Sequence, residues 1–118
     1  MSSGDDDKRV TLRDVQDAGG TRRLEAFINH AGRLVISGQD LGPATSSFWG
    51  GSEYEWSRSV KPADFPKLAA ELGLPTDATS TQLLDALGEQ YSGSAAMGVD
   101  DMLERSGVDV SKWSRVGE

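Results

Sequence analysis

The chain contains no cysteine. This absence excludes disulfide bonds, thiolate nucleophiles and thiolate-bound metals, and nothing else in the composition indicates an oxidising compartment. Histidine is almost as scarce, because His30 is the only one in the chain. Histidine metal sites usually need a second imidazole or neighbouring cysteines, and a serine–histidine–carboxylate triad would depend on His30 alone. We therefore expect no metal site and no catalytic residue, and we interpret His30 as an exposed turn residue.

Long apolar runs are also absent. The longest run is too short to cross a bilayer, which needs about 20 residues. The first ten residues, MSSGDDDKRV, are acidic and polar where a signal peptide would be basic and then apolar. The sequence therefore predicts a cytoplasmic protein with a disordered acidic tip over residues 1–8. The length of residues 9–118 fits a single domain.

Basic residues are in the minority. The chain has 12 lysines and arginines against 19 aspartates and glutamates, a net charge of −7. Binding to nucleic acid or to anionic membranes depends largely on neutralising phosphates, so this balance disfavours both. It suits a basic protein as the partner.

The two halves of the chain differ in pattern. Short alternating or β-branched segments fill the first half, around residues 10–13, 24–28, 34–36 and 53–60. The fourth segment places Tyr54 and Trp56 on one face and Glu53 and Glu55 on the other. Helical stripes follow after Lys61. This order predicts an α+β fold, in which an antiparallel sheet of about four strands packs against two or three C-terminal helices.

Helix signals are clear in the second half. Pro62 suits a first helical turn, Gly73 suits a helix end, and Thr79 with Gln82 matches a capping box. A third, short helix is expected around Met97 and Met102, which we interpret as core residues, and the tail after it as docked. The stripes predict five core leucines: Leu68, Leu72, Leu83, Leu84 and Leu87.

Residues 38–56, GQDLGPATSSFWGGSEYEW, are the strongest candidate for a functional surface. They combine glycines, a proline and four aromatic residues between two strand-like segments. We interpret Gly38 as a bulge or strand end and Trp56 as a core residue. Trp49 is either a lid on the core or an anchor for a partner. The candidate binding residues are Asp40, Phe48, Trp49, Glu53, Tyr54 and Glu55.

Motifs for phosphate and calcium binding are missing from this segment. Its glycines are not followed by lysine and serine or threonine, and Asp40 lacks the spacing of a calcium loop. No cofactor is therefore expected. Glu53 and Glu55 share a strand face at roughly 7 Å, a spacing that two-carboxylate chemistry uses and that a solvated strand face also produces.

Four pieces of the chain resemble a family of small, uncharacterised, soluble bacterial proteins. They are GQDLGP at residues 38–43, FWG at 48–50, YEW at 54–56 and WSRVG at 113–117. The resemblance implies a bacterial cytoplasmic protein, and it implies no activity or site residues.

Three hypotheses about function follow. The first is a non-enzymatic protein-binding module, with an immunity-type neutraliser of a basic partner as one form. The second is a small-ligand-binding protein or minor enzyme that uses Asp40, Glu53, Tyr54 and Glu55 near an aromatic pocket. The third is an oligomer that pairs exposed strand edges.

Overall fold

The structure is a computed structural model that describes residues 9–17, 20–41 and 53–117. These residues form an antiparallel sheet and a group of helices inserted before the last strand. In chain order the elements are β1 (Arg9–Asp17), β2 (Gly20–Ile28), β3 (Leu34–Leu41), β4 (Glu53–Val60), the 3-10 helix η1 (Pro62–Asp64), α2 (Phe65–Glu71), α3 (Ser80–Gln90), the 3-10 helix η2 (Gly93–Gly98), α4 (Val99–Ser106) and β5 (Val110–Gly117).

The sheet is a five-stranded antiparallel meander in the order β1-β2-β3-β4-β5. The predicted α+β class and antiparallel sheet are confirmed, but the strand number is five and not four. The additional strand is the tail, whose residues 110–117 pair with β4. Without this strand, β4 would present an unpaired row of backbone N–H and C=O groups.

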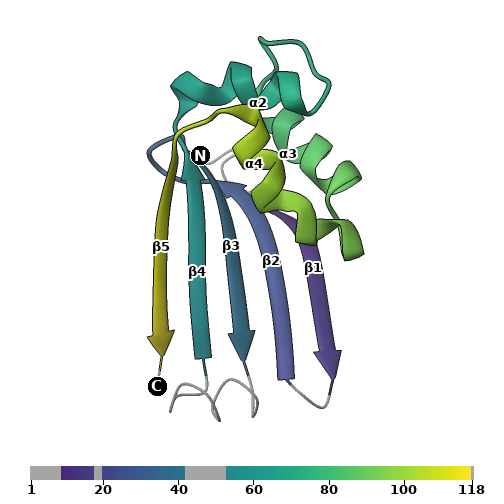
Figure 1. The fold of residues 1–118 in the computed structure, drawn as a ribbon, viewed down its shortest axis with the longest axis vertical. Coiled ribbons are helices and arrows are strands. Elements are labelled where there is room, and N and C mark those ends of the chain that lie inside the picture. The colour runs from purple at the N-terminus through teal and green to yellow at the C-terminus, as the bar shows by residue number, and fades with distance from the viewer. Residues whose placement is uncertain (1–8, 18–19, 42–52, 118) are drawn as a thin grey trace, which may run out of the picture.

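The helices lie on one face of the sheet and gather near one end of it, while the strands continue beyond them (Figure 1). Helix α3 packs against β1 and β2, η2 packs against β1, and α2 packs against α3 and α4. The sheet therefore has a helix-covered face, which we call the helix side, and an opposite face, which we call the open side. Part of the helix side also extends past the helices.

Strand register assigns each residue to a side. Ala26 lies opposite Ile36, and Ile36 lies opposite Arg58, so these three residues share the helix side. The same register places Glu25, Ser37 and Ser57 on the open side. The expected division of β4 into a Tyr54/Trp56 face and a Glu55 face is confirmed.

A β-bulge in β1 changes the side on which one residue lies. The register shifts between Thr11 and Arg13, so Leu12 is an extra residue and Arg13 pairs with Leu24. Simple alternation placed Arg13 with Thr11, away from the core. The bulge overturns this simple alternation, because one inserted residue reverses the alternation of all residues that follow it. Arg13 consequently reaches the helix side.

The turn between β2 and β3 follows from its residues. Gly32 has φ +79°, which glycine adopts without steric cost. The Oδ1 atom of Asn29 accepts hydrogen bonds from the backbone N–H groups of Ala31 and Arg33, at 3.0 and 2.9 Å. The turn joins β2 and β3 as a hairpin, and His30 is exposed in it, as predicted.

The helix boundaries agree with the sequence signals. Pro62 begins η1, which continues into α2, and Gly73 with φ +78° follows the end of α2. At α3, Thr79 Oγ1 accepts from Gln82 N–H at 3.1 Å, and Gln82 Oε1 accepts from Thr79 N–H at 2.8 Å. The capping box is therefore formed in both directions.

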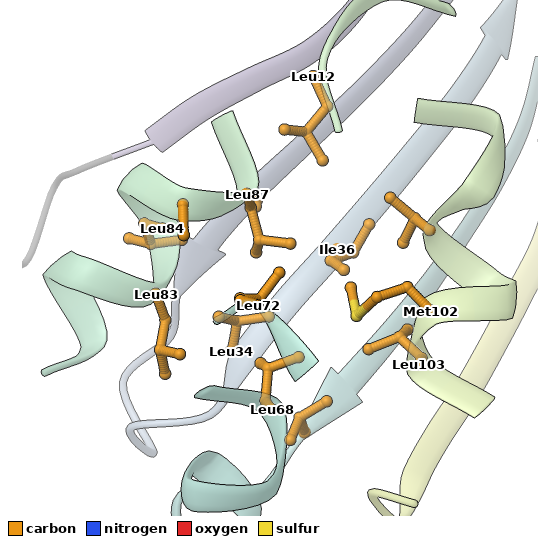
Figure 2. Close-up of a cluster of buried hydrophobic side chains, with 14 of the residues drawn as sticks. Leu12, Leu34, Ile36, Leu68, Leu72, Leu83, Leu84, Leu87, Met102 and Leu103 are labelled. Carbon is orange, nitrogen blue, oxygen red and sulfur yellow. The ribbon is translucent and has the colours of Figure 1, made fainter. Parts of the chain in front are cut away.

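The core lies between the helix side of the sheet and the helices. In Figure 2, Leu87 of α3 points toward Ile36 of β3, Leu34 of β3 lies beside Leu72, and Met102 of α4 closes the cluster from the other side. All five predicted core leucines are buried: Leu68, Leu72, Leu83, Leu84 and Leu87.

Polar contacts on the surface link α2 to α4. Arg105 Nε donates to Glu71 Oε2 at 3.1 Å, and Arg105 Nη2 donates to the Tyr91 hydroxyl at 3.4 Å. The hydrogen bond to Glu71 raises the pKa of Arg105 above its ordinary value. Because Arg105 is exposed, this pair contributes little to stability.

Asp64 is a buried carboxylate that holds the beginning of β5. Its Oδ2 atom accepts a hydrogen bond at 2.9 Å from the backbone N–H of Asp109, the residue before β5. Its Oδ1 atom lies 3.9 Å from Lys67 Nζ. Asp64 thus joins η1 to a strand that is distant in the sequence.

We expect Asp64→Ala to lower the free energy of unfolding by about 1 kcal/mol, because the Asp109 N–H loses its acceptor. Asp64→Asn keeps an acceptor oxygen and should lose less. Urea denaturation measures both values, and hydrogen exchange of the β5 amides shows whether the loss is local. An alanine variant with native stability and native β5 protection would contradict this role.

Candidate functional site

The predicted site residues do not form one cluster. Asp40 and Tyr54 are opposite each other on β3 and β4, on the helix side. Glu55 is on the open side, opposite Gln39. Asp40 and Glu55 are thus separated by the sheet and cannot act together on one substrate.

The other three candidate residues are described less fully. Glu53 begins β4, where it pairs with Leu41. Phe48 and Trp49 lie outside the described residues. The question whether Trp49 is a lid or an anchor therefore stays a prediction.

Asp40 instead borders a hollow of about 220 Å³ on the helix side, which we call the η2 hollow. Apolar residues from β2, η2 and α4 line part of it, and arginines from β1 and β2 line another part. Trp56 lies between these two kinds of lining. The main residues are Arg13, Arg22, Leu24, Asp40, Trp56, Ala96, Met97, Val99 and Asp100.

The indole of Trp56 fits where it does because the residue opposite it, Gly38, has no side chain. Gly38 lies opposite it on β3, and a Cβ atom at Gly38 would come within 2.2 Å of the indole Cε2. The indole therefore occupies the space above the β3 backbone. We predicted a bulge or strand end at Gly38, and this is wrong: Gly38 is inside a regular strand. Only the packing of Trp56 explains the need for glycine.

Trp56 is half-buried and packs against the edge of the core, so its expected core position is correct only in part. The Arg58 guanidinium lies 4.9 Å from the centre of its ring, within cation–π range. Arg58 Nε also lies 3.4 Å from Asp100 Oδ1. Arg58 thus contacts both Asp100 of α4 and Trp56, which lines the η2 hollow.

Arg13 has an unusual partner at the rim of the hollow. Its Nη1 atom donates to the Met97 sulfur at 3.1 Å, and a thioether is a weak acceptor. Within the described part of the chain, Arg13 has no carboxylate partner. A guanidinium has five N–H donors, so most of those of Arg13 stay available to another group.

The two methionines that we expected in the core behave differently. Met102 is fully buried, as predicted, whereas Met97 is 71% exposed. The prediction for Met97 is wrong because the residue belongs to η2, where it caps the Arg13 guanidinium and does not face the core. Sequence spacing alone does not distinguish these two environments.

A second hollow, of about 360 Å³, lies between α4 and the strands β4 and β5, and we call it the α4 hollow. Three carboxylates from α4 line it: Asp100, Asp101 and Glu104. Arg58 and Lys112 line the strand side. Since Arg58 is paired with Asp100, the remaining charges are those of Asp101, Glu104 and Lys112. The hollow is therefore slightly acidic.

Strand β5 beside this hollow is solvent-exposed. Residues 111–114 are all exposed, and Trp113 is 52% exposed. The predicted docking of the tail is confirmed, because residues 110–117 pair with β4, but Trp113 itself points to solvent. Trp113 lies opposite Ser57 on the open side, the face away from the described helices (Figure 1). A large exposed aromatic side chain on an edge strand is typical of a contact surface.

Apart from Trp113, Phe27 and Val35, the open side carries mainly charged and polar residues. Glu25 accepts from Arg9 at 3.3 Å and from Arg23 at 3.4 Å, and the Arg9 guanidinium stacks 4.1 Å from the Phe27 ring centre. Val35 is buried on this side, outside the main core. These charge pairs satisfy one another, so they indicate a solvated sheet face.

No group of three or more metal-ligating side chains occurs among residues 9–17, 20–41 and 53–117. In the same residues, no helix is both long and apolar enough to span a membrane. Comparison of the chain with protein-family models, curated proteins and solved structures found no match. The geometry of the two hollows and of β5 is therefore the basis for a function.

Sequence reasoning did not find Arg13, Met97 or the α4 carboxylates as site residues. The sequence does contain a signal for Arg13. Val10 and Leu12 fit one alternation along the strand, but the next apolar residue, Val15, fits the other alternation, which it shares with Arg13. A signal for the α4 hollow was the acidic run Asp100–Asp101 beside a short helix. Neither signal specifies which other elements of the fold these side chains lie beside.

Proposed function

We propose that this protein is a non-enzymatic protein-binding module that takes an extended, basic segment of its partner along β5. The observation that carries the proposal is the exposed edge of β5, with Trp113 on one side of the sheet and the α4 hollow on the other. A partner strand adds to such an edge through main-chain hydrogen bonds, and the flanking side chains provide specificity.

The two edges of the sheet differ in availability. Strand β1 carries the bulge at Leu12, and α3 and η2 pack against it. Bulges and covering helices are devices that protect a sheet edge from pairing. Strand β5 has eight residues and a regular register with β4, and it contains no proline. Partner addition is therefore favoured at β5.

Charge favours a basic partner. Asp101 and Glu104 are exposed beside β5, and the chain as a whole carries a charge of −7. A basic segment lying along β5 would meet these carboxylates on the helix side. Acidic fields also steer basic proteins toward encounter. A toxin neutralised by an immunity protein is one partner of this class, and the cytoplasmic location and bacterial origin that we expect from the sequence belong to the same proposal.

Site-specific photo-crosslinking tests the proposal. A benzophenone amino acid replaces Trp113 in cells that naturally make the protein, and a matched variant carries it at Glu89, an exposed residue of α3. We expect a protein adduct from position 113 and none from position 89. Adduct formation should decrease strongly at high salt, because the attraction between exposed charges is screened.

Charge reversal provides the second arm of the experiment. The double variant Asp101→Lys, Glu104→Lys alters exposed residues, so the fold should persist, as circular dichroism would show. It should abolish the adduct from position 113. An equal adduct in the charge-reversed protein would contradict a basic partner. An adduct with a second copy of the chain would assign β5 to self-association instead.

A further inference from the structure

We infer that the η2 hollow is a binding site for a small zwitterion with an apolar body, namely a free amino acid with an apolar or aromatic side chain. The inference rests on the juxtaposition of two oppositely charged side chains, Arg13 and Asp40, at the rim of a hollow with an apolar and aromatic lining. It does not depend on partner binding at β5.

The first step concerns the carboxylate of the ligand. The Arg13 guanidinium borders the hollow, and among the described residues its side chain donates to the Met97 sulfur alone. Its other donors have no carboxylate partner in the described part of the chain. Arginine binds carboxylates through two parallel N–H···O bonds, which are about twice as strong as neutral hydrogen bonds. A ligand carboxylate would provide the acceptors that the thioether does not.

The second step concerns the ammonium group. Asp40 also borders the hollow, and its carboxylate has no hydrogen bond or ion pair with the described residues. It comes from β3, two strands away from Arg13 on β1. Its backbone lies opposite Arg22 and Tyr54. Because Asp40 and Arg13 share the helix side and border the same hollow, the Asp40 carboxylate can accept from the ammonium group of a ligand whose carboxylate binds Arg13.

The third step concerns the body of the ligand. Leu24, Ala96 and Val99 are buried and provide apolar surface, and Trp56 provides an aromatic surface. Trp56 is fixed by Gly38 and Arg58, so little freedom is lost when a ligand packs on it. The volume of about 220 Å³ is below the roughly 300–1,000 Å³ of typical ligand pockets. This size suits a single amino acid.

Three related probes separate the parts of the inference. L-Phenylalanine carries both charges, phenylacetate lacks the ammonium group, and phenethylamine lacks the carboxylate. Each is titrated into the isotope-labelled full chain, and NMR follows the Met97 methyl group and the Trp56 indole N–H. We expect saturable shifts with L-phenylalanine. Each single-charge probe should bind at least about tenfold more weakly than L-phenylalanine.

Two substitutions assign the charges. Arg13→Gln should weaken L-phenylalanine and phenylacetate by roughly tenfold or more and leave phenethylamine unchanged. Asp40→Asn should weaken L-phenylalanine and phenethylamine and leave phenylacetate unchanged. The matched controls are Arg9→Gln and Asp14→Asn, which alter the same residue types on the open side. Both controls should bind like the native chain.

Several results would overturn the inference. If L-phenylalanine causes no saturable shift at Met97 or Trp56 in the folded native chain, the hollow is not an amino-acid site. If phenylacetate binds as tightly as L-phenylalanine, the site recognises an anion alone and the role of Asp40 is wrong. If the open-side controls weaken binding as much as Arg13→Gln and Asp40→Asn, the effect is general electrostatics.

Discussion

Leu68→Ala and Leu84→Ala are each expected to lower the free energy of unfolding by about 2–5 kcal/mol. Leu68 on α2 and Leu84 on α3 are both essentially inaccessible to solvent. Each lies in the layer between helices and sheet (Figure 2), where the removed methyl groups leave a cavity that the β-sheet backbone cannot close. Chemical denaturation monitored by circular dichroism measures the loss.

Met97→Ala is the matched control for these truncations. Met97 is a large apolar residue of the same helical region, but it is 71% exposed. Its substitution should change stability by no more than about 0.5 kcal/mol, as for most surface positions. Losses below about 1 kcal/mol for both leucine variants would show that the helices do not pack on the sheet as described.

Gly38→Ala is the second substitution with a large expected effect, a loss of about 1–3 kcal/mol. The added Cβ would lie 2.2 Å from the indole Cε2 of Trp56, a distance that two carbons cannot adopt. The indole must therefore leave the β3 backbone and give up its contacts with the core edge. The stacked Arg58 would lose its aromatic partner as well.

Two measurements check this prediction. Chemical denaturation gives the loss of stability, and the NMR signal of the Trp56 indole N–H reports the displaced ring. Gly98→Ala is the control, since a Cβ there would make only an ordinary contact, at 3.7 Å from Tyr91, and φ at Gly98 is −90°. A Gly38→Ala variant with native stability and an unmoved Trp56 signal would disprove the packing described for this strand pair.

The Gly38 variant also bears on the η2 hollow. Trp56 forms one wall of the hollow, and its position depends on Gly38 from the adjacent strand. We expect a displaced indole to weaken L-phenylalanine binding even where the charges of Arg13 and Asp40 are intact. The shape of the hollow and its charged rim are therefore separable by experiment.

Local sequence signals were sufficient for η1, α2 and α3. The capping box of Thr79 and Gln82, Gly73 with its positive φ and Pro62 at the first turn act within a few residues, so their effect does not depend on distant contacts. The leucine stripes similarly predicted burial, because an apolar helix face must pack against some apolar surface, and the identity of that surface was not needed. The alternation in β2 and β4 identified the side of each residue for the same reason.

Local signals were insufficient where a residue depends on a neighbour that is distant in the sequence. Gly38 is explained only by Trp56, and Met97 only by Arg13. Strand β5 pairs with the edge of β4, although all of the helices lie between these two strands in the sequence. These pairings have no signature in a short window of sequence.

The amino-acid sequence by itself determined the fold class, the helix ends, the buried leucines and the acidic charge of this protein. Each of these follows from periodicity, from backbone conformation or from composition. Only the tertiary structure decided which charges meet at the two hollows. One extra residue in the β1 bulge moves Arg13 to the helix side, where it borders the same hollow as Asp40. Side-chain direction alternates along a strand, so a single irregularity decides which face receives the charge.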